Sequence, residues 1–344
     1  MIDFKRKLFF NAYKKRIPLT VTIEIIGQCN FRCVHCYIGD SCRKDILTYE
    51  QLVDFGNQII EMGCLYVILT GGEVLLHPDF ERIYLFFAQK GMCVSVFTNG
   101  SLITKRIIDL FVKFPPRVVE ITMYGFSPTT YELVTKTNQF DAVKQNILLL
   151  KKNSINVLLK MFIVKENYSD FDAVYAFSVE QHLPFKYDFM ILSDPARPES
   201  THNIDKDAMM VLEGKRNITP NGYNELTYEF LVSNQIKKLF MCGAGRSSCW
   251  LKSSYRIRIC NFLDSIEFDL RKNSFEHIWS LLPEFINEDI PQQSKCFDCQ
   301  YRVYCDYCPA KSYLINSNLS LASPPDIYCK LASMRFDKYE KGER

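Results

Sequence analysis

The chain has 344 residues, 47% of them hydrophobic, which is enough for a large domain with a smaller one beside it. Its net charge of +3 gives no reason to expect a nucleic-acid partner or a polyanionic substrate. The sequence shows no secretory signal and no apolar run of membrane-spanning length, so we expect a cytoplasmic protein without membrane contact. Fourteen cysteines in a reducing compartment indicate metal or redox chemistry rather than disulfides.

Residues 1–18 form a basic arm that carries two clusters, Lys5-Arg6-Lys7 and Lys14-Lys15-Arg16. We expect this arm to be a solvated amphipathic helix, and the alternative is an element that docks a membrane or a peptide.

Residues 19–200 alternate between strand-like and helix-like segments. The expected strands are Thr20–Ile26, Tyr66–Leu69, Cys93–Phe97, Val118–Thr122, Asn156–Val164 and Phe185–Leu192. The expected helices are Thr48–Glu61, with Thr48 as N-cap, Phe80–Lys90, Thr104–Lys113, Asp141–Lys152 and Asp170–Gln181. This alternation predicts an α/β fold, a partial (β/α)6 TIM-type barrel with helices outside a parallel sheet.

Polar features follow four consecutive predicted strands. Cys29, Cys33 and Cys36 follow the first strand, Gly71-Gly72-Glu73 the second and Thr98-Asn99-Gly100 the third, while Thr122 ends the fourth. Because the carboxyl ends of parallel strands share one face of a barrel, we expect these features to surround one ligand.

The cysteine triplet has the spacing C-x3-C-x2-C. Structural zinc prefers four closed ligands, which Cys42 or His35 could complete. A 4Fe-4S cluster on three thiolates would instead leave one iron open to a substrate.

The triplet, the aromatic Tyr37 after it and the Gly-Gly-Glu strand end together resemble the radical S-adenosylmethionine (SAM) superfamily over residues 19–192. The resemblance implies that SAM chelates the open iron, and that an electron from the cluster cleaves SAM to a 5'-deoxyadenosyl radical that abstracts hydrogen from a substrate. It also implies the SAM contacts: Gly71, Gly72 and Glu73 at the amino group, Tyr37 at the adenine, Asn99 and Thr122 at the ribose and methionine, and Lys136 as candidate at the carboxylate. Thr122 departs from the family, in which serine is frequent.

The last third of the chain holds most of the remaining cysteines. We expect a bridging region at residues 201–241, a cysteine-rich domain at residues 242–335 and a tail at residues 336–344. The cysteine spacings in the domain are C-x6-C-x10-C, then C-x2-C-x5-C-x2-C, then Cys329. Eight thiolates are the complement for two fully ligated 4Fe-4S clusters, and two zinc sites are the alternative.

This arrangement resembles the SPASM domain, a small cysteine-rich iron-sulfur extension of many radical SAM enzymes. The resemblance implies a first auxiliary cluster on Cys242, Cys249, Cys260 and Cys308, and a second on Cys296, Cys299, Cys305 and Cys329, which makes three 4Fe-4S clusters in all. Two features depart from the family signature: the last short spacing is two rather than three, and Tyr255 stands near the customary glycine. Because such auxiliary clusters have a cysteine on every iron, we expect them to transfer electrons rather than bind substrate. We also expect an external electron donor such as flavodoxin or ferredoxin.

Three cysteines remain outside these groups. Cys64 and Cys93 have apolar neighbours and are expected in the core, whereas Cys42, in a polar loop, is a candidate reactive hydrogen donor.

The resemblance implies a maturase that abstracts hydrogen from a residue of a ribosomally made peptide, giving an oxidative cross-link or an epimer. The alternatives are formylglycine formation on a sulfatase, which Asn261 disfavours because an acidic residue is common there; oxidation of a tetrapyrrole or small metabolite; and a non-catalytic electron-transfer protein. A barrel strand near Thr20 leaves no room for a leader-binding winged helix before it, so we expect leader recognition elsewhere, such as on a separate partner protein.

Overall fold

A computed structural model describes residues 2–36, 38, 43–190, 202–216, 237–240, 242–263, 265–310 and 324–340. Tyr37 and Cys42, which the sequence analysis singled out, lie outside the described residues.

One sheet organises the molecule, in the order β6-β5-β4-β3-β2-β1-β7-β8-β9. Its strands are β1 (Thr20–Ile26), β2 (Tyr66–Gly71), β3 (Cys93–Thr98), β4 (Val118–Thr122), β5 (Val157–Phe162), β6 (Phe185–Asp188), β7 (Ser248–Leu251), β8 (Arg256–Arg258) and β9 (Glu267–Asp269). Strands β1 to β6 pair in parallel, which confirms the predicted six-stranded α/β fold. Strand β7 adds in parallel to β1, and β8 and β9 continue the sheet antiparallel.

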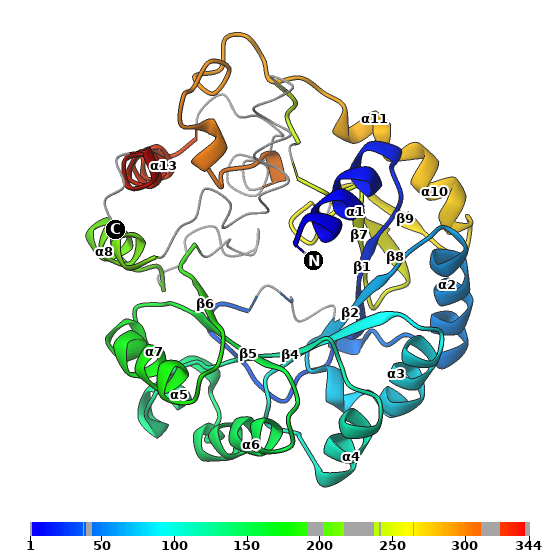
Figure 1. The fold of residues 1–344 in the computed structure, drawn as a ribbon, viewed down its shortest axis with the longest axis vertical. Helices are drawn as coiled ribbons and strands as arrows, with labels where there is room; N and C mark the ends of the chain where they lie inside the picture. The colour runs from blue at the N-terminus through cyan, green and yellow to red at the C-terminus, as the bar shows by residue number, and fades with distance from the viewer. Residues whose placement is uncertain are drawn as a thin grey trace.

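Helices lie outside the curved sheet (Figure 1). Those between the first six strands are α2 (Tyr49–Glu61), α3 (Phe80–Gln89), α4 (Lys105–Lys113), α5 (Pro128–Thr135), α6 (Phe140–Lys152) and α7 (Phe171–Glu180). The other α-helices are α1 (Ile2–Lys15), α8 (Lys206–Lys215), α10 (Phe275–Leu281), α11 (Pro283–Ile286) and α13 (Asp326–Glu340). Short 3-10 turns are η2 (Val74–Leu76), η3 (Tyr168–Asp170) and η4 (Arg302–Tyr304). No described helix has the length and apolar character needed to cross a membrane.

Local sequence signals account for several of these helices. The expected N-cap Thr48 forms a capping box with Gln51 at the start of α2. Helix α5 was not expected from the sequence, although Ser127 caps it and Pro128 occupies its first turn.

Side chains alternate between the two faces of each strand. In β5, Val157, Leu159 and Met161 are buried and belong to the core under the helices. Lys160 lies on the other face, in line with Thr122 of β4 and Lys186 of β6. The inner wall of the barrel therefore carries charged and polar side chains, which suits a ligand cavity.

The cysteine-rich region is attached to the barrel by more than chain connectivity. Strand β7 belongs to the barrel sheet, and Trp250 and Lys252 both donate to Oε1 of Glu24 in β1, each at 2.9 Å. Helices α8 and α13 lie side by side (Figure 1), joined by a buried ion pair between Glu213 and Arg335. The segment boundaries at residues 18, 200, 241 and 335 stay predictions.

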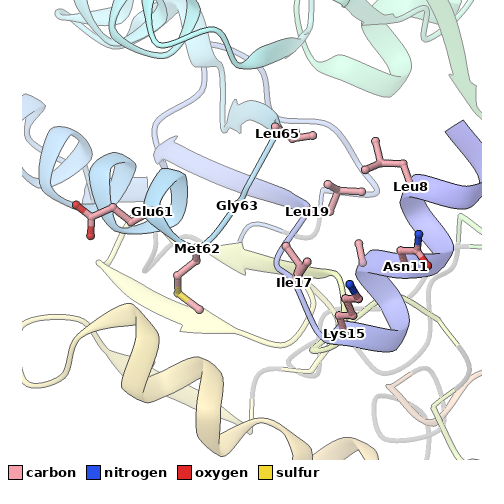
Figure 2. A pocket seen from close by; sticks show the side chains of 10 residues that line it. Leu8, Asn11, Lys15, Ile17, Leu19, Glu61, Met62, Gly63 and Leu65 are labelled. Carbon is pink, nitrogen blue, oxygen red and sulfur yellow. The ribbon is translucent and has the colours of Figure 1, made fainter. Parts of the chain in front are cut away.

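A cavity of about 330 Å³ lies between α1, the end of α2 and the starts of β1 and β2. Figure 2 shows the side chains that line it. Leu8, Lys15, Leu19, Glu61 and Leu65 are among its lining residues. Because Leu19 and Leu65 precede their strands, this cavity lies at the amino-terminal edge of the sheet, away from the polar features at the carboxyl ends.

Candidate active site at the carboxyl ends of the strands

The loop after β1 carries the cysteine triplet, and we call residues 27–36 the cluster loop. Backbone hydrogen bonds shape it locally: Cys36 N donates to Cys33 O at 3.1 Å, and Phe31 N donates to Cys29 Sγ at 3.3 Å. Arg32 N and Val34 N donate to Thr135 O and Val134 O, at 3.0 and 2.9 Å. The end of α5 therefore holds the outer side of the cluster loop.

The end of β2 holds the other side of the cluster loop. Gly72 N donates to Ile26 O at 2.7 Å, and Glu73 N donates to Gln28 O at 2.8 Å. A Cβ on Gly72 would lie 2.3 Å from Gln28 O, and one on Gly71 would lie 2.3 Å from Ile26 O. Both positions require glycine, because the last residue of β1 and the backbone of the cluster loop pass too close for a side chain.

The Glu73 carboxylate is buried and accepts three hydrogen bonds from within the chain. Oε1 accepts from Thr98 Oγ1 at 2.6 Å and from Leu75 N at 3.0 Å, and Oε2 accepts from Asn99 N at 2.7 Å. Burial raises the pKa of this carboxyl, although these hydrogen bonds oppose the shift. Glu73 thus clamps the end of β2 to the end of β3.

Asn99 connects β3 to the cluster loop. Its Nδ2 donates to Asn30 Oδ1 at 2.8 Å and lies 4.0 Å from Cys29 Sγ. Its Oδ1 accepts from Ser101 Oγ at 2.7 Å, and Asn30 Nδ2 donates to the same hydroxyl at 2.9 Å. The sequence analysis missed Asn30 and Ser101; the position of Asn30 next to Cys29 was the available signal.

An aromatic wall backs the cluster loop. His35 stacks on Phe162 with ring centroids 4.9 Å apart and planes 9° apart, and its ring is 5.6 Å from that of Tyr124. Tyr124 also contacts the rings of Phe31 and Tyr131. Burial lowers the pKa of His35 to about 4, so the imidazole is neutral near pH 7. Its buried Nδ1 has no hydrogen-bond partner among the described residues.

The sequence analysis considered His35 only as a zinc ligand and missed Tyr124 and Phe162. The position of His35 inside the cysteine spacing was the signal that could have marked it.

The three thiols interact electrostatically with one another. Burial raises the pKa of Cys29 to about 11 and raises that of Cys33 further. Across the residues that the structure describes, no three His, Cys, Asp or Glu side chains converge closely enough to hold a metal ion as they stand. Three neighbouring thiols in one braced loop nevertheless fit the donor set of a three-thiolate cluster, and binding it would release their protons.

The two other expected SAM contacts lie at the same end of the sheet. Thr122 ends β4 beside Lys160 of β5. Lys136 follows α5 with a φ of 60°, and its ammonium donates to Leu133 O at 2.8 Å. The exposed Lys136 side chain therefore caps its own helix, and its role toward SAM stays a prediction.

The C-terminal cysteines fall into two groups. Cys242, Cys260 and Cys308 interact electrostatically in the first group. In the second group, Cys296 interacts with Cys299, Cys305 and Cys329.

Three cysteines lie apart from these groups. Cys249 is buried in β7, and the thiol with which it interacts is Cys64, which is buried as expected. Cys93 is exposed at the start of β3, so its expected place in the core was wrong.

Comparison with known proteins identifies the barrel. Residues 23–178 match the family model described as the Radical SAM superfamily, a range that contains the cluster loop and the ends of β2, β3 and β4. Residues 23–178 therefore belong to the radical SAM superfamily. Members of this superfamily use SAM and a 4Fe-4S cluster.

Three curated relatives are similar to most of this radical SAM chain. An "AdoMet-dependent heme synthase" of Methanosarcina barkeri is 21% identical, covering 90% of this chain and 97% of the relative. The "Antilisterial bacteriocin subtilosin biosynthesis protein AlbA" of Bacillus subtilis is 24% identical, covering 88% and 69%. "Mycofactocin maturase MftC" of Mycobacterium tuberculosis is 23% identical, covering 84% and 77%.

Solved structures support the fold over nearly the whole chain. Streptococcus suis SuiB bound to its precursor peptide SuiA matches with a TM-score of 0.71 at 13% identity, covering 94% of this chain and 79% of that one. The structure of anSMEcpe with bound AdoMet matches with a TM-score of 0.70 at 18% identity, covering 95% and 94%. The cysteine-rich C-terminal region is therefore like that of SPASM structures, as the sequence analysis expected.

Proposed function

We propose that this radical SAM enzyme abstracts hydrogen from a residue of a ribosomally made peptide and forms an oxidative cross-link or an epimer. The observation that carries the proposal is the cluster loop, whose three thiols are braced by β2, β3 and α5 at the carboxyl ends of the parallel strands. The relatives AlbA, named for subtilosin biosynthesis, and MftC, named as a mycofactocin maturase, support the substrate class.

Each residue at the cluster loop has a role in the proposed reaction. Cys29, Cys33 and Cys36 hold a 4Fe-4S cluster, which when bound supplies the electron for SAM cleavage. The backbone of Gly71 and Gly72 holds the SAM amino group, and the absence of side chains at these positions lets the backbone of residues 26–28 pass close beside it. The hydrogen bonds that Glu73 accepts at the end of β3 keep that backbone in position.

The inner wall of the barrel positions the substrate. Glu120, which is buried, accepts from Lys186 Nζ at 2.6 Å and lies 3.8 Å from Lys160 Nζ. Two ammonium groups share one carboxylate, so this wall keeps a positive charge that can hold a carboxylate of the substrate.

The two C-terminal cysteine groups hold auxiliary clusters that take an electron from the substrate radical. Cys296, Cys299, Cys305 and Cys329 supply four thiolates for one of them, which suits electron transfer because no iron stays open. An external flavodoxin or ferredoxin would reduce the SAM cluster, and a separate protein could present the leader of the peptide.

A tetrapyrrole substrate is the second candidate function. It is favoured by the similarity to a heme synthase over 97% of that relative's length. The positive inner wall would then face a propionate instead of a peptide carboxylate. Formylglycine formation has weaker support, because the likeness to anSMEcpe shows the fold alone and Asn261 replaces the expected acidic residue.

Product analysis tests the proposed function. The reconstituted enzyme, SAM and reductant are incubated with a short peptide encoded next to its gene. We expect 5'-deoxyadenosine together with a peptide lighter by two hydrogens, or one of unchanged mass that takes up solvent deuterium. Formation of 5'-deoxyadenosine that depends on an iron porphyrin or a sulfatase peptide, and not on the neighbouring peptide, would contradict the proposal.

A further inference from the structure

Cys249 lies in β7, whereas Cys260 lies two residues beyond the end of β8. Leu251 pairs with Ile257, and both are fully buried on the helix-covered face of the sheet. Cys249 shares this face, since it is two residues before Leu251 and pairs with the buried Val21 of β1. Cys260 follows the end of β8 and interacts with Cys242 and Cys308 instead.

The surroundings of Cys249 are those of a core side chain. It is 4% exposed and interacts with Cys64, whose Sγ lies 3.6 Å from Leu19 O and 3.5 Å from Tyr66 O. Cys64 precedes β2 at the amino-terminal edge of the sheet. Cys249 therefore belongs to the core between the sheet and its helices, apart from the Cys242 group.

Ser248 lies next to the segment that carries Cys242. It pairs in parallel with Thr20 of β1, and its N donates at 2.8 Å to the carbonyl of Gly243, the residue after Cys242. A Cβ on Gly243 would lie 3.3 Å from Ser248 Oγ, so the Ser248 side chain lies beside the backbone that follows Cys242. The side chain at this position ends in a hydroxyl.

We infer that the first auxiliary site has three thiolates, from Cys242, Cys260 and Cys308, and a fourth coordination position beside Ser248 that no cysteine fills. The inference rests on the auxiliary clusters of the proposed function and revises their ligands. An iron without a protein thiolate can bind a nitrogen, oxygen or sulfur donor of the peptide. This cluster would then hold substrate as well as accept electrons.

Cluster oxidation distinguishes three thiolates from four. In a three-thiolate site, ferricyanide takes one electron from [4Fe-4S]2+, and the unprotected iron leaves as Fe2+, which gives [3Fe-4S]+. The SAM cluster would react in the same way, so the parent protein for the test carries Cys29→Ala, Cys33→Ala and Cys36→Ala. Iron and sulfide are assayed first, and the EPR spectrum is recorded after oxidation.

The parent should hold two clusters and develop a [3Fe-4S]+ signal from one of them. Adding Cys249→Val should leave the iron content and the signal unchanged, whereas Cys260→Ser should lower the iron content. Adding Ser248→Cys should supply the missing thiolate and abolish the signal.

Two results would overturn the inference. They are a parent that keeps both clusters intact on oxidation, and a Cys249→Val protein that is folded by circular dichroism but has lost one cluster. If Cys249→Val does not fold, the oxidation of the parent decides alone. A parent without iron would overturn both this inference and the proposed auxiliary clusters, whereas a parent with two oxidation-stable clusters would leave the proposed clusters standing.

Discussion

At the scale of single residues, the site depends on close backbone contact as much as on side-chain chemistry. Gly72 is the clearest case, because a Cβ there would lie 2.3 Å from Gln28 O and 2.4 Å from Gly27 O. Both atoms belong to the backbone of the cluster loop, so neither can rotate away.

We predict that Gly72→Ala lowers the free energy of unfolding by about 1–3 kcal/mol, as overpacking does, and also lowers the iron bound by the cluster loop. Gly214→Ala is the matched control, because nothing lies within 4 Å of its Cβ position in α8. Thermal denaturation and iron analysis of both variants would measure the effect. A Gly72→Ala protein as stable and iron-loaded as Gly214→Ala would show that the loop can move aside.

Spacing predicted residue types well and their orientation less well. It predicted the cluster cysteines and the strand-end glycines, because a cluster needs a fixed number of thiolates and a tight backbone contact needs glycine at a fixed position. It also flagged Tyr255 near the customary glycine, and the structure keeps a left-handed backbone there with φ of 63°. The side of the sheet on which Cys249 lies depends on the register of β7, which no local pattern records.

At the scale of elements, a buried ion pair joins α13 to α8. Arg335 donates to both carboxylate oxygens of Glu213 at 2.9 Å, and to Tyr304 O at 2.9 Å. Both charged side chains are nearly inaccessible to solvent. Since Tyr304 belongs to the segment that carries Cys305 and Cys308, Arg335 links the cysteine-rich segment to both helices.

We predict that Arg335→Ala lowers the free energy of unfolding by about 3–5 kcal/mol, because it leaves the buried Glu213 carboxylate with only Arg216, whose Nε lies 3.8 Å from Glu213 Oε2. Lys295→Ala is the control. It removes an exposed ion pair to Asp326 of the same helix and should cost less than about 1 kcal/mol. Urea denaturation of the two variants gives the comparison, and equal losses would argue that the buried pair is unimportant for stability.

Hydrophobic periodicity predicted the six parallel strands and most of the helices between them. It missed α5, whose residues Pro128–Thr135 give a weak amphipathic pattern, although the end of this helix braces the cluster loop. It also did not predict that β7 joins β1, because pairing between segments so distant in the chain is decided by tertiary packing.

At the scale of the whole molecule, the barrel and the cysteine-rich region share one sheet, because β7 pairs with β1. A buried ion pair between Lys252 and Glu24 also joins the two parts. Glu24 of β1 accepts hydrogen bonds from Trp250 and Lys252, so the proposed SAM site and the proposed auxiliary clusters are parts of one framework. An electron could pass from substrate to auxiliary cluster within this framework without domain movement.

The most direct test of the central claim is reductive cleavage of SAM by anaerobically reconstituted protein. The account predicts 5'-deoxyadenosine from the wild-type protein and from a Cys93→Ser control, which removes an exposed thiol away from the cluster loop. It predicts none from the Cys29→Ala, Cys33→Ala, Cys36→Ala protein, which should lose one cluster's worth of iron and keep the rest. Cleavage of SAM that survives the triple change, or wild-type protein that holds zinc with little iron, would contradict the account.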